Sequence, residues 1–161
     1  MEIWQFQENV IFFGQGGMTA SNVSERLLID LKLYTPDIVF LHFGGNDIRE
    51  NSSCKAVCEN IKFIVDELYR AGNKVVFVAE ICERGNFTKA PGLTYDIFKK
   101  QKNTVNRSLQ KLFGDKFVKF KDISFPNDYD KDLVHFSDSG MKKYFYRIRR
   151  TFLSSRCMSD K

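Results

Sequence analysis

Several absences narrow the function of this chain before any motif is considered. Its 161 residues contain no Cys-x-x-Cys pair, no His-Glu-x-x-His motif, no Walker-type loop and no dinucleotide-binding glycine pattern. We therefore expect no metal, no cofactor and reduced cysteines. No apolar run approaches the length of a membrane span, and the first residues lack a basic segment followed by an apolar one. These features predict a soluble, cytoplasmic protein with no membrane span.

The composition is that of a single globular domain over residues 1–161. Hydrophobic residues make up 43% of the chain and include 16 phenylalanines, enough for a packed core. The formal charge of +5 permits weak attraction to anionic partners without requiring it. No repeats, linkers or low-complexity stretches divide the chain, and its oligomeric state is left open.

Strand and helix patterns alternate four times along the chain. Strands are predicted at 9–13, 38–43, 74–79 and 117–120, and helices from Thr19 or Ser21 to 33 and over 53–71, 95–113 and 137–153. This order predicts a three-layer α/β/α fold with a parallel sheet. Chemistry in such folds lies beyond the carboxyl ends of the strands, where residues 14–17, 44–47 and 80–93 fall, and the 132–135 loop can reach the same edge.

Two short motifs carry the chemistry. Gly44-Gly45-Asn46-Asp47 follows an apolar strand and presents an amide that can stabilise an oxyanion. Asp47 is expected to hold this loop by accepting backbone N–H bonds. Asp132 precedes His135 by three residues, so it can orient the imidazole as a general base. Taken alone, each motif also has an ordinary explanation as a turn or a surface pair.

In order and spacing these motifs resemble the SGNH hydrolases, or GDSL-type esterases and lipases, over most of the chain. Gly-Gly-Met-Thr at 16–19 resembles the family's second block, which implies that Gly17 gives a backbone N–H to an oxyanion hole. The other motifs resemble the third and fifth blocks, which implies Asn46 as a second oxyanion donor, His135 as base and Asp132 as its orienter. The resemblance also implies a flavodoxin-like fold and a small ester or acetylated substrate.

The family's first block, Gly-Asp-Ser, is absent, because none of the 16 residues before Gly17 is a serine. We interpret the chain as N-terminally incomplete, lacking the first strand and helix of the family fold and any targeting signal there. Reading Gly14-Gln15-Gly16 as a decayed first block would leave the second block unaccounted for. Helix capping explains Thr19 and Ser21 better than a nucleophilic role does, and Ser24 is expected inside the helix. The chain as given is therefore expected to be inactive.

Three functional hypotheses remain open. The chain belongs to an esterase lineage whose serine lies upstream, or it is a non-catalytic ligand-binding module, or it is an interaction domain that contacts nucleic acid weakly through its basic last helix. We expect His42 to be a core or near-core histidine with a hydrogen-bond partner. We also expect three apolar residues of the 80–93 loop to help form the acyl-side wall. The wall residues are Ile81, Phe87 and Leu93. The basic residues of the last helix are Lys142, Lys143, Arg147, Arg149, Arg150 and Arg156.

Overall fold

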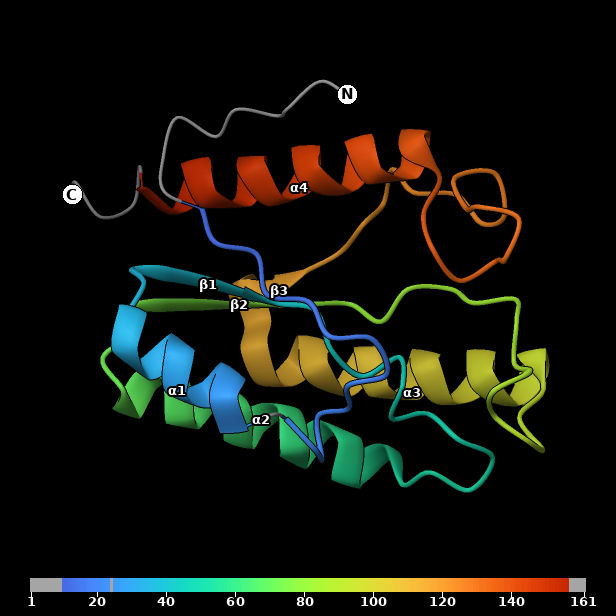
Figure 1. Cartoon of the computed structure of the whole chain (residues 1–161). Coiled ribbons are helices and arrows are strands. Elements are labelled where there is room, and N and C mark those ends of the chain that lie inside the picture. The colour runs from blue at the N-terminus through green and yellow to red at the C-terminus, as the bar shows by residue number, and fades with distance from the viewer. Residues whose placement is uncertain (1–9, 24, 157–161) are drawn as a thin grey trace.

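The computed structural model describes residues 10–23 and 25–156, with helices and strands alternating along most of that range (Figure 1). In chain order the elements are α1 (Glu25–Tyr34), β1 (Ile38–Leu41), α2 (Cys54–Arg70), β2 (Val75–Ala79), α3 (Tyr95–Phe113), the short 3₁₀ helix η1 (Gly114–Lys116), β3 (Phe117–Val118) and α4 (Asp138–Arg156). The three strands form a parallel sheet in the order β1-β2-β3.

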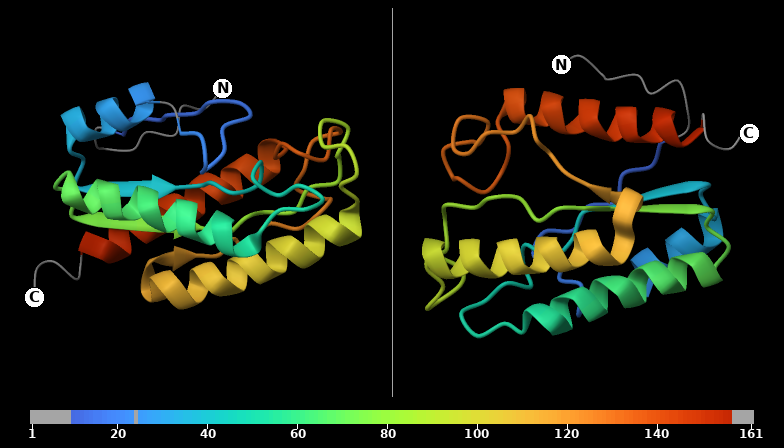
Figure 2. Two further views of the ribbon diagram at one scale, coloured as in Figure 1. Left: turned by 90° about the horizontal axis from the view of Figure 1, so that it is seen from below. Right: turned by 180° about the vertical axis from the view of Figure 1, so that it is seen from behind.

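Helices cover both faces of this sheet, as predicted. α1, α2 and α3 lie on one face and α4 lies on the other, so the molecule has three layers (Figures 1 and 2). Val39 and Val76 are opposite each other in the β1–β2 register, and both are buried. Strands covered on both faces read as continuous apolar runs, which is why β1 and β2 were recognisable from the sequence.

The helices begin at side-chain caps that the sequence makes visible. Ser53 accepts a hydrogen bond from the N–H of Ala56 at the start of α2, and Thr94 accepts one from Ile97 at the start of α3. Ser137 caps α4, because its Oγ accepts from the N–H of Gly140. Each cap satisfies a backbone donor that the first turn leaves unpaired. The buried face of α2 follows helical spacing and comprises Val57, Cys58, Ile61, Ile64, Val65 and Leu68.

The strand predicted at 9–13 is not found in the part of it that the structure describes. Residues 10–13 are irregular, and Asn9 lies outside the described residues. Phe12 packs edge-on against Phe145 of α4, with ring centroids 5.5 Å apart, and Phe13 packs against Tyr34 of α1. The apolar run therefore contacts helices, whereas a β-strand requires a paired neighbour for its backbone groups.

The first helix begins later than Thr19 or Ser21, so neither residue caps it. Thr19 and Asn22 form an isolated antiparallel bridge. The carboxylate of Asp47 accepts from the N–H of Ala20 at 2.9 and 3.0 Å and from Ser21 at 3.3 Å. Asp47 thus holds the 19–22 turn in a non-helical conformation. Asp47 accepts backbone N–H bonds as expected, but they come from the 19–22 turn and not from the 44–47 loop in which it lies. Ser24 lies outside the described residues.

Candidate active site

A cavity of about 360 Å³ opens beyond the carboxyl ends of β1 and β2. The 44–47 turn leaves β1 at this edge, the 80–93 loop leaves β2, and the loop before α4 reaches it from the other side of the sheet. Asn46 and His135 are therefore brought to one cavity although 89 positions separate them. The lining residues are Met18, His42, Phe43, Gly44, Gly45, Asn46, Ile81, Cys82, Glu83, Arg84, Phe98, Val134, His135, Phe136, Met141 and Tyr144.

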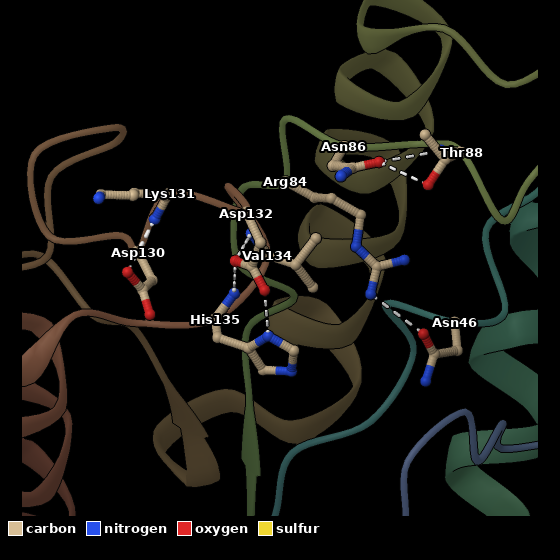
Figure 3. Close-up of polar contacts among 9 residues, drawn as sticks. All are labelled: Asn46, Arg84, Asn86, Thr88, Asp130, Lys131, Asp132, Val134 and His135. Carbon is tan, nitrogen blue, oxygen red and sulfur yellow. Dashed lines mark hydrogen bonds and ion pairs between the residues drawn. The ribbon is translucent and has the colours of Figure 1, made fainter.

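Asp132 and His135 form a compact pair within one loop. Oδ2 of Asp132 lies 2.5 Å from Nδ1 of His135, and Oδ1 accepts from the backbone N–H groups of Val134 and His135 at 2.9 Å each (Figure 3). The bonds from the backbone and ring of His135, followed by that from Val134, lower the pKa of Asp132 to about 2. At neutral pH the carboxylate is ionised and only accepts, so Nδ1 of His135 carries a proton, and in the neutral tautomer of the ring the lone pair is on Nε2.

The amide of Asn46 has one orientation that satisfies both of its neighbours. Its Nδ2 donates to the carbonyl of Met18 at 3.1 Å, and its Oδ1 accepts from Nη2 of Arg84 at 3.1 Å. A carbonyl can only accept and a guanidinium can only donate, so a flipped amide would lose both bonds. One N–H of Nδ2 donates to the carbonyl of Met18, and the other N–H is available to donate to a ligand.

Two charged side chains of the β2 loop also line the cavity. In Figure 3 the side chain of Arg84 lies between Asn46 and the loop of Asp132 and His135. Burial lowers the pKa of Arg84, and the nearby charge of Arg49 lowers it further, whereas Asp132 raises it. Glu83 is paired with the ammonium of Lys102, which is 8% exposed, so its negative charge is compensated.

Gly17 lies next to the cavity wall, and its neighbour Met18 is the residue that lines the cavity. Gly17 is exposed and has a φ of +76°, a conformation that favours glycine in this turn. The turn is tied to the site twice, through the bond of Met18 with Asn46 and through the bonds of Ala20 with Asp47. The role expected for the N–H of Gly17 stays a prediction.

His42, expected to be a core or near-core histidine with a hydrogen-bond partner, lines the cavity. Its ring stacks on that of Tyr144 with centroids 5.5 Å apart, and its Nδ1 lies 3.1 Å from the Tyr144 hydroxyl. Although the residue keeps an exposed surface, desolvation of its ring lowers the pKa of His42 to about 4. A group with so low a pKa is a weak base, so His135 is the better candidate of the two histidines.

No serine or threonine lines the cavity within the part of the chain that the structure describes. Cys82 is the one lining residue with a thiol, and its Sγ donates to the carbonyl of Glu80 at 3.8 Å. Burial raises the pKa of Cys82 to about 12, with a further contribution from Glu80. The group is therefore a protonated thiol at neutral pH and not the thiolate that nucleophilic attack requires.

The apolar wall differs in part from the expectation. Ile81 lines the cavity as predicted, but Leu93 is buried in the core and Phe87 packs against Phe98 with ring centroids 5.3 Å apart. Sequence reasoning did not single out Arg84 or Tyr144 as site residues. Arg84 follows β2 closely at the carboxyl edge, which is a usable signal, whereas Tyr144 is brought in only by the packing of α4.

Over residues 10–23 and 25–156, no three His, Cys, Asp or Glu side chains are grouped so that they could hold a metal ion. In the same part of the chain, no helix is both long and apolar enough to cross a membrane.

Fold and site together define an α/β protein with a histidine–aspartate pair and an amide at the carboxyl edge of its sheet. The model of the GDSL-like lipase/acylhydrolase family matches residues 4–143, and the chain belongs to that family. No curated protein sequence matches the chain.

Solved structures show the same fold. A putative acylhydrolase from Bacteroides fragilis is 20% identical, with a TM-score of 0.70 over 87% of this chain and 72% of that one. A GDSL-like lipase from Bacteroides thetaiotaomicron is 17% identical, with a TM-score of 0.67 over 86% of this chain and 73% of that one.

Proposed function

We propose that this domain binds a small acyl or acetyl ester in the cavity between Asn46 and His135, and that residues 1–161 alone do not hydrolyse it. The observation that carries the proposal is the composition of one cavity wall. It holds a general base and an amide donor, and in the described residues it holds no serine or threonine. Membership of an acylhydrolase family supports an ester as the ligand.

The chemistry assigned to each residue follows from its hydrogen bonds. The free N–H of Asn46 would donate to the ester carbonyl oxygen, and in hydrolysis it would stabilise the negative charge that develops there. Nε2 of His135 would accept the proton of an attacking hydroxyl group, and Asp132 would stabilise the resulting imidazolium. Gly17 is the second proposed oxyanion donor. Without a nucleophile these groups bind the ester, and loss of the serine in a well-studied hydrolase lowers turnover about a millionfold.

Binding can be measured by following backbone amide NMR signals while dimethyl succinate, a neutral diester, is added. We expect shifts at Asn46 and His135, and about fivefold weaker binding in Asn46→Ala, since the lost hydrogen bond is worth about 1 kcal/mol. Asn103→Ala is the matched control, because Asn103 is exposed on α3 outside the cavity. Absence of shifts at both site residues would overturn the binding role.

Turnover is tested separately with p-nitrophenyl acetate. The chain and its His135→Ala variant should release p-nitrophenol no faster than free imidazole at the same concentration, and neither should label with a fluorophosphonate. Turnover above this level that disappears in His135→Ala would show that the chain hydrolyses esters by itself, and the inactive half of the proposal would be wrong.

A further inference from the structure

The cavity contains a guanidinium group that forms no ion pair with a carboxylate of the described residues. Arg84 is half-buried and lines the cavity, yet its hydrogen bond runs to the neutral amide of Asn46. No aspartate or glutamate of the described residues lies within ion-pair distance of it, although ion pairs are frequent elsewhere in the molecule. Buried or half-buried charges in proteins usually have a partner, so an unpaired one in a cavity calls for an explanation.

Two acidic residues near Arg84 bond to other groups. Asp132 is close enough to act electrostatically on Arg84, but its two oxygens accept three N–H bonds from Val134 and His135. Glu83 precedes Arg84 and lines the same cavity, but its Oε1 bonds to the ammonium of Lys102, and its buried Oε2 has no hydrogen-bond partner in the described residues, Arg84 included. The positive charge of Arg84 is therefore left facing the cavity.

The hydrogen bond to Asn46 uses only Nη2, which leaves the Nε and Nη1 groups as donors. Guanidinium groups pair preferentially with carboxylates, because the planar fork of N–H groups matches two carboxylate oxygens. Burial and the charge of Arg49 both disfavour the protonated form of Arg84, so an anion placed in the cavity would relieve a cost that the folded chain carries.

We propose that Arg84 is a specificity-determining residue that selects esters carrying a carboxylate close to the scissile carbonyl. This inference rests on the proposed function, because the ester must occupy the same cavity. The competing explanation is that Arg84 is a positioning residue only, which fixes the orientation of the Asn46 amide and has no direct contact with the ligand. The two explanations differ in whether charge on the ligand affects affinity.

The test compares dimethyl succinate with monomethyl succinate, which has nearly the same size and carries one carboxylate at pH 7. Dissociation constants come from NMR titration of the full chain. We expect monomethyl succinate to bind at least about tenfold more tightly, as a charge-assisted hydrogen bond would give. Arg84→Gln removes the charge and keeps a polar side chain. It should bring the ratio of the two dissociation constants close to one, because monomethyl succinate loses more affinity than dimethyl succinate does.

Two further variants control for fold and for overall charge. Arg84→Lys keeps the cation and should retain a preference for the monoester. Arg107→Gln removes one exposed positive charge on α3, outside the cavity, and should leave the ratio unchanged. Equal affinities of the unmodified chain for both esters would overturn the selectivity while leaving the proposed function intact. Equal weakening of both in Arg84→Gln would assign Arg84 to positioning alone, and no binding of either ester would overturn both proposals.

Discussion

The cavity has a base side, formed by Asp132 and His135, and a donor side, formed by Asn46 and its partners. The two sides are held in place by different kinds of contact. Asp132 and His135 hold each other within a four-residue loop through bonds that involve no other element. Asn46 depends on Met18 and Arg84, which come from loops 28 and 38 positions away. A local pair needs only its own loop conformation, whereas the donor side requires that several elements pack correctly. Damage to the core should therefore disturb the donor side first.

The largest expected loss of stability comes from removing a core side chain next to the donor side. Ile48 follows the 44–47 turn and is completely buried, so Ile48→Ala should lower the free energy of unfolding by about 2–5 kcal/mol. Val134 lies in the base loop and is half-buried, so Val134→Ala should cost about 1 kcal/mol or less. Urea unfolding followed by circular dichroism measures both. Equal losses would contradict the contrast between the two sides.

An intermediate loss of stability is expected where the loop after β2 contacts the loop of Asp132 and His135. The N–H of Gly85 donates to the carbonyl of Leu133 at 2.8 Å, and a Cβ at Gly85 would lie 2.9 Å from side-chain atoms of Leu133 and Phe125. Gly85→Ala should lower the free energy of unfolding by about 1–3 kcal/mol and shift the NMR signals of both His135 and Asn46.

Gly16→Ala provides the control for Gly85→Ala, since a Cβ at Gly16 has no atom within 4 Å and its φ is not positive. Its unfolding free energy should stay within about 0.5 kcal/mol of the unmodified chain. If Gly85→Ala left the His135 signals in place, the two sides would not be coupled through this contact.

The smallest effect on stability is expected from acid titration of the base pair. The pKa of Asp132 is about 2 in the folded chain, below the value of about 3.9 for an unperturbed aspartate. Its contribution to stability is therefore fully present above about pH 4 and is lost as the pH falls through about 2. NMR titration of the Asp132 carboxyl carbon should give a midpoint near 2. A midpoint near 4 would show that the pair does not persist in solution.

The sequence predicted what depends on local pattern. The α3 boundaries, the start of α4 near Ser137 and the parallel α/β order followed from periodicity and capping chemistry, whereas the caps at Ser53 and Thr94 were found in the structure. The predictions of a first strand at 9–13 and of a first helix beginning at Thr19 or Ser21 were wrong, because both features depend on partners distant in the sequence. Apolar residues at 11–13 suit a strand or a helix contact equally well, and hydroxyls at 19 and 21 suit a cap or a turn.

The amino-acid sequence alone determined the family, the layer order and the aspartate–histidine pair, since each is encoded in residues close together or in a regular pattern. Tertiary structure decided which side chains share the cavity. Only folding places Arg84 against Asn46 and Tyr144 against His42, because a side chain's neighbours across the sheet are set by packing and not by position along the chain.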